Sequence, residues 1–199
     1  MAAHAHARKP VGGQARHGTE TRLRAGTIKA QTNYFQLFQE TLTMAVTVNI
    51  DLGYEFEVKA KAADVFAVLA DVPTSASHFP KVDKLTDMGD GVYKWEMEKV
   101  GTAQVNIQTV YASKYVSDKA KGTVKWTPVK GVGNSLVSGG WKITDNKKST
   151  GIELKITAEV TVPLPGLMKM IVGPVVEGEF EKLVEKYIAN LIKKFGGEA

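Results

Sequence analysis

Residues 166–195 read GLMKMIVGPVVEGEFEKLVEKYIANLIKKF. Apolar residues recur in this segment at spacings of one, three and four, which is the pattern of one face of an α-helix. That face consists of Leu167, Met168, Ile171, Val172, Val175, Val176, Phe180, Leu183, Val184, Tyr187, Ile188, Leu191, Ile192 and Phe195. A helix of this length is about 45 Å long and needs an extended apolar surface to lie on. We therefore expect a long helix packed on one large curved sheet.

Glycine and proline interrupt the first half of this predicted helix, at Gly173, Pro174 and Gly178. Two interpretations are open. A proline inside a helix kinks it, whereas a proline is favoured at the first position of a helix, in which case residues 167–172 form a separate short helix. Under either interpretation residues 163–178 are the least rigid part of the cover, and we predict that they gate access to the interior.

The sequence between the N-terminal segment and the long helix is dominated by alternation of apolar and polar residues, which is typical of strands with one covered face and one wet face. This alternation predicts strands at 50–58, 92–99, 105–111, 123–127, 137–143 and 152–162. Two short helices are expected after the first strand, at 62–70 and 74–79. The predicted class is therefore α+β, with a curved antiparallel sheet of six to seven strands wrapped around the C-terminal helix.

The formal net charge of +5 is concentrated near the N-terminus. Residues 1–43 carry six basic and two acidic side chains, and all the arginines of the chain precede residue 25. The remainder is nearly neutral, which argues against a nucleic-acid partner. It also lacks the arginine that usually binds phosphate in a dedicated nucleotide site. The absence of cysteine excludes disulfides and a cysteine nucleophile.

Residues 1–43 are expected to form a basic, disordered arm, because their first part holds almost no large apolar residue. We favour an upstream extension before a translation start at Met44 over a functional arm, and expect residues 44–199 to form a single domain. No apolar run is long enough to span a bilayer. We therefore expect no transmembrane segment and a cytoplasmic location.

Several short segments together suggest a family. They are the strand at 54–58, the helix at 62–70, the turn at 79–82, the residues at 91–93, the run at 150–154 and the entry to the last helix at 165–167. Over residues 46–195 their order and spacing resemble the helix-grip fold of the START/polyketide-cyclase (SRPBCC) superfamily. Members of that superfamily bind hydrophobic or amphipathic small molecules between sheet and helix. The resemblance therefore implies a cavity and does not specify a reaction.

The covered face of the predicted strands collects the large aromatic residues, including every tryptophan of the chain. A packed core would explain most of them, but Trp and Tyr also line ligand pockets, where each supplies one polar group. The candidate ligand-binding residues are Tyr93, Trp95, Met97, Tyr111, Trp126 and Trp141 from the strands, Met168, Val172, Val176 and Phe180 from the helix, and His78 and Lys99.

His78 and Lys99 are the polar candidates in that set. His78 is the only histidine outside the arm, and the resemblance places its segment near the mouth of the pocket. Lys99 falls on the same side of the predicted strand as Trp95 and Met97, the side that faces the interior. Its side chain is therefore expected either to extend past the end of the sheet to water or to meet a ligand carboxylate. No paired acid and base stands out, so catalytic residues stay unassigned.

The resemblance implies binding or transport of a hydrophobic or amphipathic small molecule, such as a lipid, a quinone or an aromatic polyketide-like compound. One alternative is a polyketide cyclase/dehydratase-type enzyme that uses the same cavity. A second is a co-chaperone-like module for protein interaction. We expect no cofactor, no metal and no nucleic acid. Transient membrane contact is compatible with the sequence, and a monomer or weak homodimer is expected.

Overall fold

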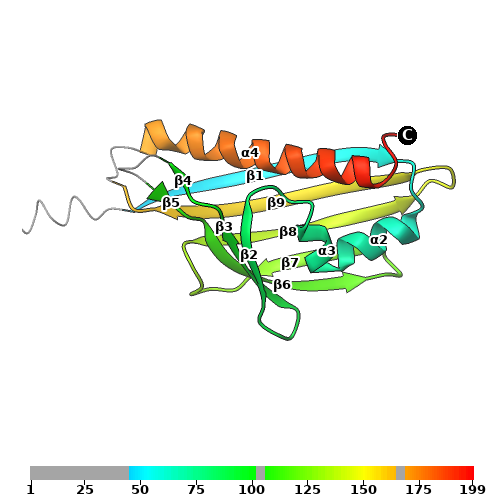
Figure 1. Ribbon diagram of the computed structural model, residues 1–199, viewed down its shortest axis with the longest axis horizontal. Helices are drawn as coiled ribbons and strands as arrows, with labels where there is room; N and C mark the ends of the chain where they lie inside the picture. Colours follow the sequence, from blue (N-terminus) through cyan, green and yellow to red (C-terminus); the bar gives the residue numbers. More distant parts are fainter. Residues whose placement is uncertain (1–44, 102–105, 165–168) are drawn as a thin grey trace, which may run out of the picture. The chain divides into compact units, whose positions relative to one another are not determined.

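The structure is a computed structural model that describes residues 45–101, 106–164 and 169–199. The arm expected over residues 1–43 lies outside the described residues. In the described part, the main sheet has seven antiparallel strands in the order β1-β9-β8-β7-β6-β3-β2 (Figure 1). Their bounds are Val46–Val58 (β1), Val82–Asp87 (β2), Val92–Met97 (β3), Val110–Asp118 (β6), Thr123–Pro128 (β7), Ser135–Asp145 (β8) and Thr150–Val162 (β9). A separate short hairpin pairs β4 (Val100–Gly101) with β5 (Asn106–Ile107).

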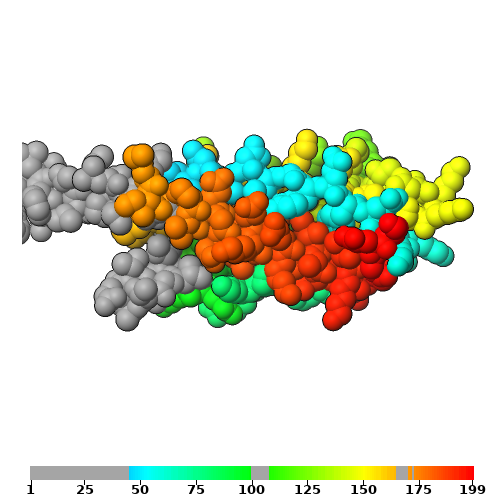
Figure 2. Space-filling view, turned by 90° about the horizontal axis from the view of Figure 1, so that it is seen from above, coloured from blue at the N-terminus to red at the C-terminus, as the bar shows by residue number. Residues whose placement is uncertain are grey.

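Three described helices complete the fold: α2 (Ala62–Ala70), α3 (Val72–Ala76) and α4 (Lys169–Lys194). Figure 1 shows α4 running along β1, and Figure 2 shows from above how α4 covers the sheet, with side chains of β1 emerging beside it. The α+β class and the two short helices after the first strand are confirmed, and the arrangement is a helix-grip fold. No described helix combines the length and the apolar character needed to cross a membrane.

The longest strands pair over their whole length, from Val46 opposite Val162 to Val58 opposite Thr150. Burial alternates along β9 as the sequence pattern predicts, since every second residue from Ile152 to Val162 is buried. These side chains form the floor on which α4 packs through its own buried residues, Val184, Tyr187, Ile188 and Leu191. The covered face of the sheet is therefore the core of the domain.

The second short helix begins earlier than the sequence pattern indicated. The prediction placed it at 74–79, whereas α3 spans Val72–Ala76. The Asp71 carboxylate caps this helix by accepting a hydrogen bond from the Thr74 backbone N–H at 2.9 Å. Pro73 fits the first turn, where a helix needs no donor. The cap and the proline together fix the start of α3.

Two predicted strands, one strand that was not predicted and one interpretation of the last helix need correction. The strand expected at 92–99 ends at Met97, and the one expected at 105–111 is divided between β5 and a strand that continues to Asp118. Strand β2 was not predicted, because a register shift between Val82 and Lys84 breaks its alternation. Pro174 lies inside α4, so the interpretation that it starts the helix is wrong.

Candidate functional site

A cavity of about 50 Å³ lies between the covered face of the sheet and the helices. Every described helix contributes to its wall, and so do five strands of the main sheet. The lining residues are Leu69, Val72, Ser75, Phe79, Trp95, Tyr111, Tyr115, Trp126, Val137, Trp141, Leu154, Ile156, Val184 and Tyr187. A water molecule needs about 10–15 Å³ of such space, so in this conformation the cavity has room for a few waters only.

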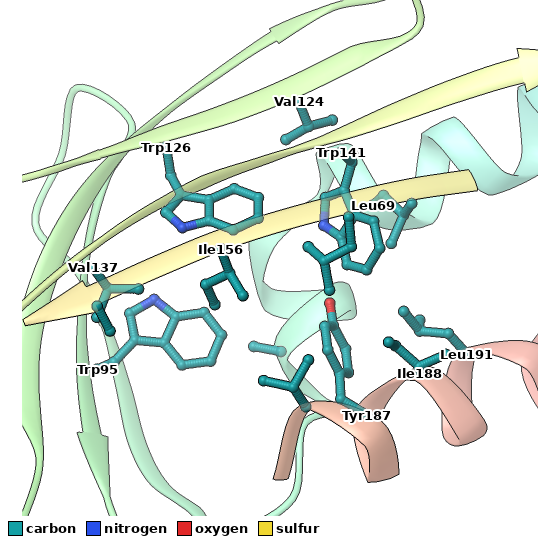
Figure 3. Close-up of a cluster of buried hydrophobic side chains, with 14 of the residues drawn as sticks. Leu69, Trp95, Val124, Trp126, Val137, Trp141, Ile156, Tyr187, Ile188 and Leu191 are labelled. Atoms are coloured by element: carbon teal, nitrogen blue, oxygen red, sulfur yellow. The ribbon is translucent and has the colours of Figure 1, made fainter. Parts of the chain in front are cut away.

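Aromatic rings form much of the wall, and Figure 3 shows the three tryptophans around Tyr187 and aliphatic residues of the core, with Trp126 and Trp141 above Tyr187 and Trp95 to one side. The rings of Trp95 and Tyr111 stack at 5.9 Å between centroids, with 8° between their planes. Trp141 meets Tyr187 edge-on at 5.9 Å. Such pairs favour offset or edge-to-face geometry and add to the free energy gained by burial. The cavity is therefore an aromatic pocket with flat walls.

A second void of about 60 Å³ adjoins the first. Phe79 and Tyr111 line both spaces and thus form the partition between them. The Phe79 ring packs against Tyr187 at 4.9 Å and against Trp95 at 6.0 Å. The two sides of the partition come from different parts of the fold, since Phe79 follows α3 and is half-buried, whereas Tyr111 belongs to β6 and is buried.

The polar groups of the first cavity are few. The hydroxyls of Ser75 and Tyr187 share a hydrogen bond at 2.5 Å across the space between α3 and α4. The indole Nε1 of Trp95 is buried and has no hydrogen-bond partner. The only other buried side-chain polar atom of the described residues without a partner is the Tyr54 hydroxyl, and Tyr54 does not line the cavity.

The tyrosines of the cavity stay protonated at neutral pH. Burial raises the pKa of Tyr111 and of Tyr187 above the ordinary value of 10.0. Burial and the neighbouring Tyr187 likewise raise the pKa of Tyr115, and the Trp95 indole N–H, which faces the Tyr115 hydroxyl, opposes part of that rise. The two groups are not aligned as a hydrogen bond, and Trp95 Nε1 has no partner. None of the described residues that line the first cavity carries a charge at neutral pH. The second void is different, because Lys81 and Glu98 contribute to its wall.

The described wall of the first cavity therefore offers ring faces and hydrogen bonds from neutral groups, and none of its side chains exchanges protons readily near pH 7. Among the described residues, no group of three or more His, Asp or Glu side chains is placed to hold a metal ion. The chemistry available at this site is thus the recognition of an apolar molecule and its orientation through one or two hydrogen bonds.

Half of the sequence-predicted site residues line one of the two spaces. Trp95, Tyr111, Trp126 and Trp141 line the first cavity. Met97 and Phe180 line the second void, and Tyr111 is shared between both. The five of these residues that lie on or next to the sheet were selected from the alternation along the strands, and that alternation turns them toward the helices, whereas Phe180 belongs to α4.

Four predicted residues lie elsewhere. Tyr93 is half-buried and meets Tyr115 edge-on at 5.9 Å, outside both spaces. Val176 packs against the core without lining either space. His78 is held through its backbone carbonyl, which accepts a hydrogen bond from Asn190 Nδ2 at 2.8 Å. Lys99 is exposed, because β3 ends at Met97 and the inward parity does not continue to it.

The last two predicted residues cannot be assigned to the cavity. Met168 lies outside the described residues. Val172 belongs to α4, but its side chain lies outside what the structure describes.

Sequence reasoning missed several lining residues. Tyr115 continues the inward parity of Tyr111, and the signal was overlooked because the predicted strand stopped at Tyr111. Tyr187 was recognised only as part of the apolar face of the helix. Phe79 and Ser75 gave no periodic signal, since they lie in or next to a very short helix whose position depends on tertiary packing.

The family described as polyketide cyclase / dehydrase and lipid transport matches residues 49–194. The comparison with curated proteins finds no significant match.

Solved structures resemble this fold at low sequence identity. A START superfamily protein from Mycobacterium smegmatis aligns with a TM-score of 0.55 and 14% identity, over 73% of this chain and 97% of that one. A conserved protein from Geobacillus kaustophilus aligns with a TM-score of 0.53 and 18% identity, over 76% of this chain and 95% of that one. The Zhui aromatase/cyclase from Streptomyces sp. R1128 aligns with a TM-score of 0.50 and 19% identity, over 73% of this chain and 90% of that one. At these identities the likeness shows the fold alone.

Proposed function

The chain belongs to the polyketide cyclase/dehydrase and lipid transport family, and from this premise we propose that it binds a hydrophobic small molecule in the cavity between the sheet and the helices. The observation that carries the proposal is the wall of that cavity, which combines three tryptophans and three tyrosines with aliphatic side chains and has no charged group among its described residues. A fully apolar core needs no such concentration of large amphipathic rings.

Binding is favoured over catalysis by the protonation states of the lining groups. General acid–base catalysis works best with a group whose pKa lies near the operating pH. The titratable side chains here are tyrosines, and burial raises the pKa of Tyr111 and Tyr187 further from neutrality. A carrier or sensor protein needs only affinity for its ligand, and the aromatic rings and neutral hydrogen-bonding groups of this cavity supply it.

The ligand enters by displacing the partition. The two spaces, about 50 Å³ and 60 Å³, are separated by Phe79 and Tyr111, and a molecule of several rings needs both together. We expect Phe79 to turn aside when the ligand binds. Residues 163–178 remain our prediction for the gate, and the described part of that segment exposes Met170 and Ile171 to solvent.

The experiment compares two matched valine-to-phenylalanine variants. Val137 on β8 lines the cavity and is 2% exposed, whereas Val116 on β6 is 61% exposed. Val137→Phe fills the cavity, so it is expected to abolish ligand retention. Val116→Phe is the control and is expected to leave it unchanged. Native mass spectrometry of protein purified from cells, together with thermal shifts across a library of neutral aromatic compounds and lipids, gives the readout.

Circular dichroism of both variants establishes that they fold. Val184→Phe, which fills the same cavity from α4, serves if Val137→Phe does not fold. The proposal is rejected if the natural chain carries no bound species and no library compound raises its melting temperature.

A second candidate function is a cyclase/dehydratase-type reaction in the same cavity. The observation that favours it is the hydroxyl pair of Ser75 and Tyr187, which could hydrogen-bond a substrate carbonyl and stabilise charge developing on it. Such an enzyme would lose turnover in Tyr187→Phe and in Ser75→Ala while still binding its substrate. Equal loss of binding and turnover would assign the pair to recognition.

A further inference from the structure

The indole N–H of Trp95 is a hydrogen-bond donor without an acceptor. Trp95 is 6% exposed, and its Nε1 has no partner and almost no contact with solvent. The residue lines the first cavity. In Figure 3 the nitrogen-bearing edge of the indole is turned toward the interior of the cluster, between Val137 and Ile156.

An unpaired donor of this kind is destabilising. Nearly all buried polar groups in folded proteins are hydrogen-bonded, and leaving one unpaired costs about 1–3 kcal/mol. An alanine or a phenylalanine at this position would avoid that cost, because neither carries a donor. The free energy is recovered if a molecule that enters the cavity brings an acceptor to Nε1.

The surroundings of Trp95 restrict what that molecule is. No described residue of the first cavity is basic, so a carboxylate or phosphate group beside Trp95 would be buried without a counter-ion. No described residue of its wall is acidic, so the same argument excludes an ammonium group there. Lys81 and Glu98 line only the second void. The ring of Trp95 lies 5.9 Å from that of Tyr111, at an angle of 8°, which presents flat faces beside the free donor.

We propose that the part of the ligand held in the first cavity is a neutral, flat ring system with a carbonyl or comparable oxygen that accepts a hydrogen bond from Trp95 Nε1. This inference rests on the proposed function and sharpens it, because it separates neutral ring ketones and similar compounds from molecules that would place a carboxylate or phosphate group beside Trp95. Trp95 is then the residue that selects the ligand by its acceptor. Its ring contributes the stacking surface, and its nitrogen contributes the specificity.

The test uses the full chain labelled with ¹⁵N, whose three tryptophans give three indole N–H signals in an NMR spectrum. Substitution of each tryptophan by phenylalanine assigns the signals. The probes are 1-indanone, indane and indane-2-carboxylate, which share one ring frame and differ in the acceptor and the charge. We expect 1-indanone to bind about tenfold more tightly than indane, and indane-2-carboxylate not to bind measurably.

The Trp95 signal distinguishes the outcomes. Binding of 1-indanone is expected to move the Trp95 indole proton downfield, while indane leaves it near its original position. If both probes bind equally and the Trp95 signal stays in place, this inference is wrong and the proposed function stands. If neither neutral probe binds and the library described above also gives no hit, the proposed function fails as well.

Tyr115→Phe provides the internal control. If the Trp95 indole proton of the free protein already lies downfield and moves back in Tyr115→Phe, then Tyr115 is its acceptor and the inference is overturned. If the substitution leaves that proton unchanged, the donor is free for the ligand.

Discussion

The Tyr187 hydroxyl on α4 lies 2.5 Å from the Ser75 hydroxyl on α3, and the two residues are separated by more than half of the chain. Both are buried. This bond joins the closing helix to the short helix at the other side of the cavity. It therefore fixes the width of the aromatic pocket where α3 and α4 meet.

Removing one partner of this bond leaves the other buried and unpaired. We expect Tyr187→Phe to lower the free energy of unfolding by about 1–2 kcal/mol, measured by urea denaturation. Ser75→Ala is expected to have a similar effect, and the double variant to lose less than the sum of the two. Strict additivity would show that the hydroxyls do not interact in solution.

Phe79→Ala is expected to join the two spaces into one. The partition between them then consists of Tyr111 alone. We expect a loss of stability of about 2–3 kcal/mol, below the usual range for a fully buried phenylalanine because Phe79 is half-buried. Probes of two fused rings should bind more tightly than they do to the natural chain, by isothermal titration calorimetry. Phe79→Leu, which keeps most of the partition, is the control and should bind them as the natural chain does.

Gly139 is the position where β8 makes room for Trp126. A Cβ at Gly139 would lie 2.5 Å from Trp126 Cζ2 and 2.3 Å from the Lys155 backbone oxygen. Gly139→Ala should therefore push Trp126 toward the cavity and lower the free energy of unfolding by about 2–3 kcal/mol. Gly53→Ala on β1 is the matched control, since its nearest neighbour is 4.0 Å away. Equal stability of the two variants would show that β8 tolerates a side chain there.

The buried tyrosines make the domain sensitive to alkali. Burial raises the pKa of Tyr111, Tyr115 and Tyr187 above the ordinary value of 10.0. As pH rises, the unfolded chain therefore loses these protons before the folded chain does. The free energy of unfolding keeps its full value below pH 10 and decreases as pH rises above it. Each tyrosine should contribute a loss of about 1 kcal/mol between pH 10 and 11, measured by urea denaturation. Tyr111→Phe should reduce that loss by about 1 kcal/mol, and an unchanged pH dependence would contradict the assignment.

The fold could be predicted from the sequence because its alternation is regular. The inward residues of β9 form one unbroken pattern, and the second half of α4 presents a regular apolar face whose residues Val184, Tyr187, Ile188 and Leu191 are buried against it. The first half of the predicted apolar face does not follow this pattern, since Ile171 and Val175 are exposed. The prediction was wrong where the backbone departs from that regularity. Lys99 was assigned inward by parity although β3 had already ended, and β2 was missed because its register shift removes the alternation.

The site could be predicted in part for the same reason. Trp95, Trp126 and Trp141 all follow from strand parity. Phe79 and Ser75 do not, because their position depends on where α3 packs against α4. Tyr187 was visible as an apolar residue, but its role as a hydrogen-bond partner depends on a residue distant in the sequence. The partition of the cavity is a property of side-chain conformation and has no sequence signal.

The pairing of β1 with β9 also determines when the domain can complete its folding during synthesis. Val46 pairs with Val162, and the Phe195 carbonyl beyond α4 accepts a hydrogen bond from the Ala60 backbone N–H. During synthesis β1 thus leaves the ribosome long before its neighbour exists, and its apolar face stays uncovered until the last strand and helix emerge. Such long-range pairing folds slowly and exposes strand edges to aggregation in the meantime. The nascent chain is therefore expected to depend on chaperones until its final helix is released.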